Sequence, residues 1–187
     1  NRHRENTMTI KRDEPDSTDS IAPAAESRVS FKSADGAVTL AGTLAIPATG
    51  CRVPAAILVS GTGPIDRDVT SAGHALFRVM AHRLAHAGIA TLRFDKRGAG
   101  ESEGDFLRAG PDDFVADVIG AVEYLVDGEG FARDRTGLVG HSEGGMVALA
   151  AASRMQRVPF CAILATPLLS GTDNLIRSLA LLARGSR

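Results

Sequence analysis

A Gly-x-Ser-x-Gly pentapeptide is the feature that most limits how this chain can fold. It runs from Gly140 to Gly144 with Ser142 at its centre, between an apolar run and an alanine-rich run. Glycines on both sides of the serine leave room for the crowded backbone of a strand that turns directly into a helix. The sequence therefore predicts a strand, a sharp turn that exposes the Ser142 hydroxyl, and a helix. A purely structural Gly-Ser turn is the alternative.

Apolar strand-like runs alternate with amphipathic segments around this turn. The predicted strands are 55–59, 89–94, 136–139 and 160–165, and the predicted helices are 74–87, a segment that opens at Pro111, and the segment after Ser142. Before them, residues 29–47 alternate with a period of two around an Asp-Gly turn, which predicts a β-hairpin. Strands separated by helices predict an α/β fold with a mostly parallel sheet and helices on both faces.

The first 26 residues differ in composition from the rest of the chain. They are polar, mixed in charge and poor in large apolar groups. Such a segment cannot bury enough surface to offset the entropy of ordering, so we expect a disordered tail over residues 1–26. A docking segment is the alternative. Residues 27–187 are predicted to form the folded core.

Composition argues against several classes of partner and cofactor. The formal net charge is −1, which favours neither nucleic acid nor an anionic membrane as a partner. No apolar run approaches the ~20 residues needed to span a bilayer, and no signal peptide is visible. A cytoplasmic location is expected, although the chain does not begin with Met and secretion stays open. Cys51 and Cys161 lack the spacing of a metal or redox pair, so neither a metal nor a cofactor is expected.

Three polar loops follow predicted parallel strands and should meet at one edge of the sheet. They are residues 61–68, residues 95–102 and the turn at Ser142. Ser142 is the candidate nucleophile of an acyl transfer, a reaction whose oxyanion needs two backbone N–H donors. The N–H groups of Thr62 and Glu143 are the candidate donors. Glu143 begins the following helix, whose positive dipole end would assist.

Charged residues fill the first two of these loops. We expect an ion-pair network that fixes the loops beside Ser142, with contact to a polar substrate as the alternative. The residues of this candidate network are Asp66, Arg67, Asp68, Asp95, Lys96 and Arg97.

No histidine is a clear base for Ser142. His141 is its neighbour, but adjacent residues in a sharp turn project in different directions, so a packed or hydrogen-bonded role is expected. His82 and His86 are four residues apart, as in some metal pairs, yet no third ligand is evident and a solvated helix face is favoured. His74 is a weak candidate.

The three loops resemble motifs of the α/β-hydrolase superfamily, and most closely those of serine esterases and serine-aminopeptidase-like hydrolases. The matching segments are Gly-Thr-Gly-Pro-Ile-Asp-Arg-Asp at 61–68, Asp-Lys-Arg-Gly-Ala-Gly-Glu-Ser at 95–102 and Gly-His-Ser-Glu-Gly-Gly at 140–145. The resemblance covers about residues 28–170. It implies hydrolysis of small carboxylic esters or related acyl compounds through an acyl-enzyme on Ser142, without a cofactor. It also implies that residues 172–187 begin a cap.

The chain departs from the family pattern after Ser142. In this fold the chain order is Ser, then Asp or Glu, then His. None of the 45 residues after Ser142 is histidine, and Asp173 is the only acid after Glu143. Asp173 is thus a candidate acid, one strand earlier than usual, and the base has no counterpart. Two hypotheses stay open: a serine hydrolase impaired here because its C-terminal part is missing, and a non-catalytic α/β-hydrolase-like binding or interaction protein or inactive fragment.

Overall fold

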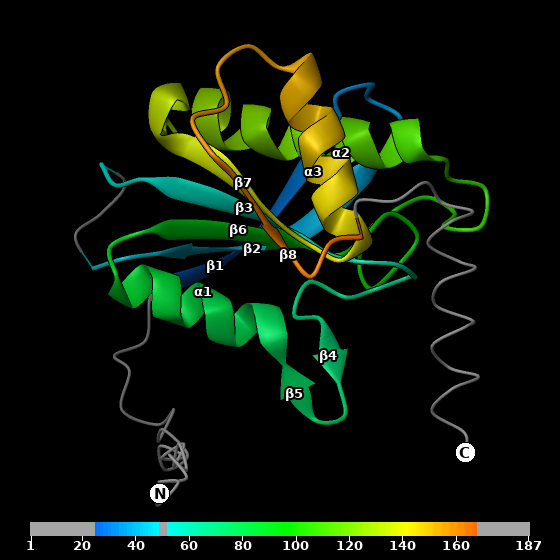
Figure 1. Cartoon of the computed structure of the whole chain (residues 1–187), viewed down its shortest axis with the longest axis horizontal. Coiled ribbons are helices and arrows are strands. Elements are labelled where there is room, and N and C mark those ends of the chain that lie inside the picture. The colour runs from blue at the N-terminus through cyan, green and yellow to red at the C-terminus, as the bar shows by residue number, and fades with distance from the viewer. Residues whose placement is uncertain (1–24, 49–51, 168–187) are drawn as a thin grey trace, which may run out of the picture.

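A six-stranded mixed sheet forms the centre of the computed structural model, which describes residues 25–48 and 52–167 (Figure 1). The strands, in sheet order, are β1 (Ala25–Lys32), β2 (Thr39–Ile46), β6 (Ala90–Phe94), β3 (Ala55–Val59), β7 (Thr136–His141) and β8 (Cys161–Leu164). Strands β6, β3, β7 and β8 run parallel to one another. Strand β2 pairs in antiparallel fashion with both β1 and β6. The predicted mostly parallel sheet is confirmed.

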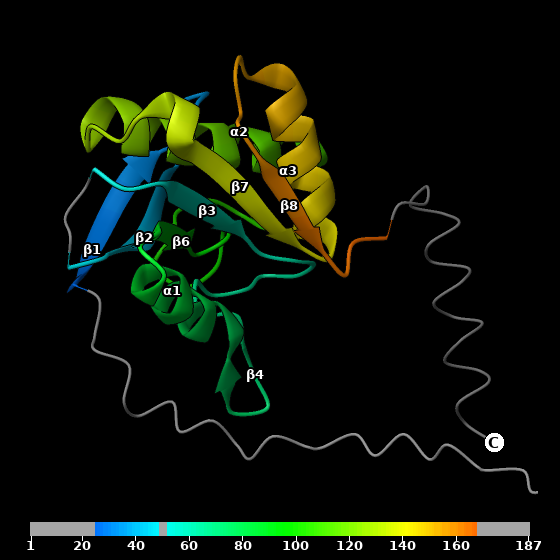
Figure 2. The same ribbon diagram turned by 60° about the vertical axis from the view of Figure 1, so that its left-hand side comes forward.

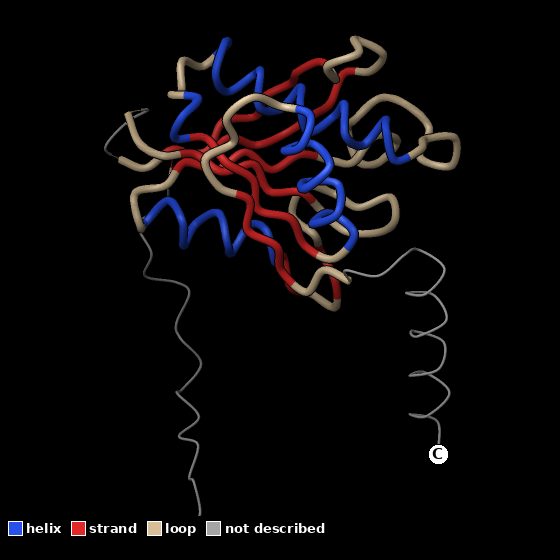
Figure 3. The backbone as a smooth tube through the Cα atoms, turned by 45° about the horizontal axis from the view of Figure 1, so that its top comes forward, coloured by secondary structure: helices blue, strands red, loops and turns tan. Residues whose placement is uncertain are grey.

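Helices cover both faces of this sheet, as the sequence predicts (Figure 3). Helix α1 (Leu76–His86) lies on one face, and α2 (Pro111–Glu123) and α3 (Glu143–Arg154) lie on the other. On the α1 side, Phe77 packs with Leu58 in a small core cluster. On the opposite side, Val118 of α2 and Ala148 of α3 belong to the larger cluster. Every residue of β3 and β6 is buried, because both faces of these strands are covered.

Strand β1 begins at Ala25, two residues before the predicted start of the folded core. Glu26 explains the difference, because its carboxylate accepts a hydrogen bond from Arg93 NH1 at 3.0 Å and contacts His82 Nε2 at 3.1 Å. Charge pairs rather than apolar side chains thus secure the start of the strand, and a search for apolar alternation misses them. Residues 1–24 lie outside the described part of the chain.

The segment predicted as a helix over 74–87 starts with strand pairing instead. His74–Ala75 forms strand β5, which pairs with β4 (Thr70–Ser71), and the two project away from the sheet (Figure 2). Helix α1 then starts at Leu76. Helix α2 begins at Pro111 as predicted and continues into a π-helical turn, η2 (Tyr124–Gly128). A 3-10 turn, η3 (Arg133–Arg135), then precedes β7.

Strand β8 is more exposed than the sequence suggests. The apolar run at 160–165 predicts a buried strand, but three of the four residues of β8 are exposed. Among the described strands β8 pairs only with β7, so it is the outer strand on its side of the sheet. The predicted cap region at 172–187 falls outside the described residues. No helix within the described ranges has the length and apolar character needed to cross a membrane.

Candidate active site

Ser142 occupies the turn between strand β7 and helix α3, in the conformation expected of an exposed nucleophile. Its φ is 56° and its ψ is −126°, a region that L-residues seldom adopt and that costs backbone strain. Its N–H donates to Leu164 O at 2.9 Å, which ties the turn to strand β8. Its hydroxyl makes no capping hydrogen bond to helix α3. The Oγ atom is therefore free for other partners.

Gly140 and Gly144 allow this turn to lie close to neighbouring backbone. A Cβ atom on Gly140 would lie 2.5 Å from Gly145 Cα, and one on Gly144 would lie 2.8 Å from the carbonyl carbon of Val59. Both distances are well inside van der Waals contact, so neither position has space for a side chain. The predicted geometry of the turn is present, and the catalytic role of Ser142 stays a prediction.

The loop that follows β3 lies directly against Ser142. A Cβ atom on Gly61 would be 3.6 Å from Ser142 Oγ. The next residue, Thr62, lines a cavity together with Ser142 and Glu143. Within residues 25–48 and 52–167, the N–H of Thr62 has no hydrogen-bond acceptor. Glu143 is the first residue of α3, where an N–H has no acceptor within the helix. Both N–H groups predicted as oxyanion donors thus lack backbone partners beside Ser142.

The cavity beside Ser142 has a volume of about 830 Å³ and a mostly apolar wall. Helices α2 and α3 and the loop before α2 supply most of this wall. Its lining residues are Thr62, Phe106, Leu107, Ala109, Pro111, Phe114, Val115, Ser142, Glu143, Met146, Val147, Ala150 and Pro167. Sequence reasoning assigned no substrate pocket. The available signal was the apolar pair Phe106–Leu107 within an otherwise polar loop.

Arg67 and Asp95 connect the first two polar loops. Arg67 NH2 donates to Asp95 Oδ2 at 2.5 Å and Arg67 Nε donates to Oδ1 at 3.0 Å, while the Arg67 backbone N–H also reaches Oδ1 at 2.7 Å. Burial would raise the pKa of Asp95, but the hydrogen bonds from Arg67 outweigh it and hold that pKa below its ordinary value. This contact supports the structural role that the sequence favours for these two residues.

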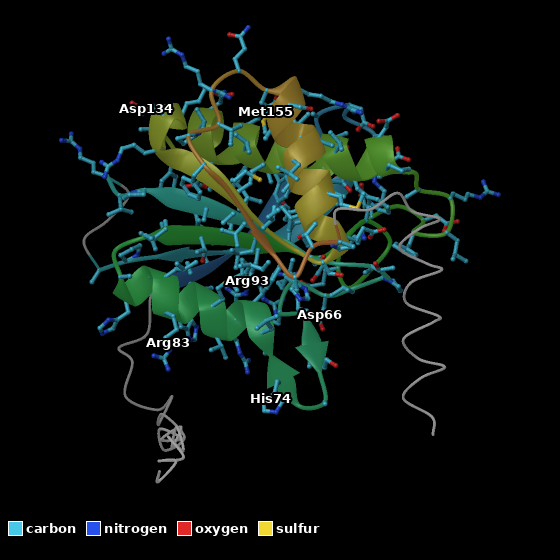
Figure 4. All side chains as sticks on the ribbon, in the orientation of Figure 1. Asp66, His74, Arg83, Arg93, Asp134 and Met155 are labelled. Atoms are coloured by element: carbon cyan, nitrogen blue, oxygen red, sulfur yellow. The ribbon has the colours of Figure 1, made fainter. Side chains whose placement is uncertain are left out.

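Asp66 and Asp68 have separate local roles. Asp66 Oδ1 accepts the backbone N–H of Asp68 at 2.9 Å, which stabilises the turn before β4. Asp68 Oδ1 accepts a hydrogen bond from Arg93 Nε at 2.7 Å (Arg93 is labelled in Figure 4). These charges line a second cavity, of about 540 Å³, that also contains Glu26, Arg28, Thr43, Arg67, Arg78, Asp95, Gly100 and Glu101.

The guanidinium of Arg97 binds helix α2, where NH2 donates to Asp117 Oδ1 at 2.7 Å and NH1 donates to Asp113 Oδ1 at 3.0 Å. These contacts do not reach residues 61–68, and support of the loops beside Ser142 by Arg97 stays a prediction. Arg97 stabilises the packing of its loop on α2, because these acceptors face it from that helix.

Acid should weaken the contact between the loops, since the pKa of Asp95 is lowered in the folded chain. The stabilising contribution of such a carboxylate is present above its ordinary pKa and is lost as the pH falls through the lowered folded value. We expect Asp95→Asn to lower the urea midpoint at neutral pH, and the gap from wild type to narrow below about pH 4. Urea titrations at several pH values measure both. Asp134→Asn, at an exposed position, is the control, and a gap independent of pH would contradict the expectation.

Lys96 belongs to the predicted charged loops, but sequence reasoning did not identify its partners. Its ammonium Nζ donates to Gly61 O and to Glu143 Oε2, both at 2.8 Å. The ammonium also lies 4.3 Å from the centre of the Phe114 ring. Only its place between Asp95 and Arg97 in a charged loop hinted at a role. Its partners are 35 and 47 residues away in sequence, so no local pattern reveals them.

No histidine in the described ranges hydrogen bonds to Ser142 Oγ. His82 contacts Glu26, and His74 lies on the projecting β4–β5 pair (Figure 4). In the same ranges, no group of three His, Cys, Asp or Glu side chains could hold a metal ion. Asp173, the candidate acid, and Cys51 lie outside the described residues.

Known structures share this arrangement of sheet, helices and loops, which is that of the α/β hydrolases. The α/β hydrolase GrgF from Penicillium sp. sh18 superposes with a TM-score of 0.68 at 28% identity, over 87% of this chain and 55% of that chain. The Pyrococcus furiosus esterase Pf2001 has the same fold, with a TM-score of 0.66 at 24% identity, over 86% of this chain and 59% of that chain. The fold is therefore a partial α/β-hydrolase fold.

Sequence comparison narrows this class to one family. The model of the family described as serine aminopeptidase, S33, matches residues 73–186, which is more than half of the chain. The chain belongs to this hydrolase family, as its three motifs suggest.

Curated relatives agree with this placement. Esterase EstD of Thermotoga maritima is 32% identical over 119 residues, which cover 63% of this chain and 28% of that protein. A 31.7 kDa protein from the traX-finO intergenic region of Escherichia coli is 34% identical over 119 residues, covering 64% of this chain and 39% of that protein. The chain therefore matches well under half the length of these relatives.

Proposed function

We propose that this chain carries the nucleophile, the oxyanion hole and a substrate pocket of a serine hydrolase that cleaves carboxylic esters. One observation carries the proposal: a strained, uncapped Ser142 lines the same cavity as Thr62 and Glu143, and the Thr62 N–H has no partner among residues 25–48 and 52–167. The relationship to esterase EstD supports ester substrates.

In the proposed reaction, Ser142 Oγ attacks the ester carbonyl carbon and loses its proton to a base. The carbonyl oxygen becomes negatively charged and accepts hydrogen bonds from the N–H groups of Thr62 and Glu143. Collapse of this intermediate expels the alcohol and leaves the acyl group on Ser142. Water then attacks the acyl carbon, which releases the carboxylic acid and restores the hydroxyl.

The cavity supports uncharged, apolar ester groups as substrates. Phe106, Phe114, Met146 and Val147 form much of its wall. Lys96, whose ammonium contacts the Phe114 ring of this wall, is already paired with Glu143, and its side chain is 6% exposed. A charged acyl chain would lose its hydration in this cavity without gaining a partner, whereas an apolar chain gains by burial.

The proton of Ser142 has no acceptor in the described part of the chain, so acylation there depends on hydroxide or a buffer base. We therefore expect slow acylation. Serine hydrolases that lack triad members retain about 10³–10⁴-fold catalysis over water through the oxyanion hole and binding. Free imidazole in the buffer should accelerate acylation because it can accept the proton of Ser142.

Acylation of Ser142 is the direct test. The 187-residue chain is incubated with p-nitrophenyl butyrate in imidazole buffer, quenched in acid and digested with trypsin, and the peptide 136–154 is examined by mass spectrometry. We expect one butyryl group on Ser142, formed faster at higher imidazole concentration, and none in Ser142→Ala. Ser153→Ala is the matched control, because Ser153 lies in the same peptide and should not affect the result.

The alternative is a binding module that uses the same cavity without cleavage. The lack of a hydrogen bond between Ser142 Oγ and any histidine that the structure describes favours this alternative. Saturable binding of the ester by the wild-type chain, with an unmodified peptide 136–154 at every imidazole concentration, would support the binding module and contradict the hydrolase. Butyrylation of the peptide that persists in Ser142→Ala would also contradict the proposed hydrolase.

A further inference from the structure

We propose that Lys96 is a positioning residue that fixes both donors of the oxyanion hole. The inference rests on the proposed function of Ser142 and goes beyond it, because the Lys96 ammonium binds Gly61 and Glu143 and not the nucleophile itself. One ammonium group contacts the two segments that supply the donors, at Gly61 and at Glu143.

The first contact orients the N–H of Thr62. This N–H and the carbonyl of Gly61 belong to the same peptide unit, and in a planar trans peptide the two groups point in opposite directions. The residues described here contain no cis peptide bond. The buried hydrogen bond from Lys96 Nζ to Gly61 O, 2.8 Å long, therefore turns the Thr62 N–H away from Lys96. That N–H has no other partner in the described ranges, and Thr62 lines the cavity of Ser142.

The same hydrogen bond should also strengthen the donor. A cation that binds the carbonyl oxygen withdraws electron density from the peptide unit, and hydrogen bonds along one chain of groups reinforce one another in this way. The Thr62 N–H then carries more positive charge when an oxyanion forms beside it. Without a cation on the Gly61 carbonyl, the Thr62 N–H would be a weaker and less constrained donor.

The second contact deals with an unfavourable charge. Glu143 follows Ser142 and lines the cavity, so its carboxylate lies close to the position where negative charge develops. Two like charges at short range repel each other, although water screens part of this repulsion because the Glu143 side chain is 38% exposed. Lys96 Nζ binds Glu143 Oε2 at 2.8 Å and neutralises this carboxylate. It thereby also restrains the residue whose N–H is the second donor.

The ammonium of Lys96 is itself held in place. Its side chain is 6% exposed and lies 4.3 Å and 5.4 Å from the ring centres of Phe114 and Phe106, within the range of cation–π attraction. The backbone N–H of Lys96 donates to Ile65 O at 3.1 Å, which is a second link to the loop of residues 61–68. A cation fixed at both ends of its side chain can define the position of the groups that it binds.

Lys96→Met tests the inference, with Arg154→Met as the control that removes an exposed cation. Two quantities are measured on each chain: the amide ¹H–¹⁵N resonance of Thr62 without substrate, and the rate at which p-nitrophenyl butyrate acylates Ser142. We expect Lys96→Met to shift the Thr62 resonance and to slow acylation about tenfold or more, below the 10²–10³-fold cost of losing a whole donor. The ester concentration at half-saturation should change little. Arg154→Met should match wild type in both.

The two proposals fail in different ways. A wild-type chain that is not acylated on Ser142 contradicts the proposed function. A folded Lys96→Met chain that is acylated at the wild-type rate, with an unmoved Thr62 resonance, overturns the role of Lys96 alone. Should Lys96→Met not fold, the hydrogen bond is tested in wild type by the scalar coupling between Lys96 Nζ and the Gly61 carbonyl carbon. A measurable coupling supports the contact, and a freely rotating, uncoupled ammonium overturns it.

Discussion

Gly144→Ala is expected to destabilise the chain by about 3 kcal/mol and to abolish acylation of Ser142. The added Cβ would lie 2.8 Å from the Val59 carbonyl carbon and closer still to the carbonyl oxygens of Val59 and Ser60. All of these are backbone atoms at the end of buried strand β3, so no flexible side chain can move aside. Relief requires helix α3 to shift from the sheet, and Ser142 would move with it.

Urea denaturation measures the free energy of unfolding of this variant. Gly128→Ala is the matched control, because its Cβ would meet only the Tyr124 ring, at an ordinary 3.6 Å. The control should remain within about 0.5 kcal/mol of wild type. A Gly144→Ala chain with the stability of the control would show that the turn at Ser142 can relax, contrary to the geometry described.

Arg97→Met is expected to cost about 3–5 kcal/mol, the usual effect of removing one partner from a buried ion pair. The side chain of Asp117 is 2% exposed, and Arg97 binds both of its carboxylate oxygens. Burial is the largest influence on the pKa of Asp117 and raises it, while the Arg97 hydrogen bonds act against burial. Without Arg97 a buried carboxylate is left uncompensated.

The pH dependence gives this prediction a second readout. In Arg97→Met the folded-state pKa of Asp117 should rise further, so the contribution of this one carboxyl to stability is present at low pH and is lost as the pH rises through that value. The deficit relative to wild type should therefore be larger at pH 7 than near the ordinary aspartate pKa of about 4. Arg154→Met removes an exposed ion pair and should change the unfolding free energy by less than about 1 kcal/mol. A deficit of that size in Arg97→Met would contradict the prediction.

The fold and the position of the candidate nucleophile could be predicted from sequence because their signals are local. Residues 140–144 and their flanks define the turn at Ser142, and continuous apolar runs mark β3 and β6 because both faces of those strands are buried. The placement of Thr62 beside Ser142 follows from the rule that parallel strands end at one edge of the sheet. Each of these predictions depends on short segments and on one topological rule.

The remaining features depend on contacts between distant segments. The partners of Arg97 are one case. Its proximity in sequence to Asp95 suggests that Arg97 pairs within the loops beside Ser142, but it binds acceptors on helix α2. The exposure of β8 is another, since an apolar run does not reveal how many neighbours a strand has. Lys96 is the third, because the pairing of its ammonium with Glu143 appears only when the loop after β6 meets helix α3.

Asp95 and Lys96 are adjacent in sequence, yet their side chains are directed to different cavities. Asp95 lines the charged cavity and holds Arg67, whereas Lys96 reaches toward the apolar cavity and holds Gly61. One peptide bond therefore joins the electrostatics of the charged cavity to the geometry of the proposed reaction site. A substitution of Asp95 would therefore alter both the contact with Arg67 and the backbone that carries Lys96.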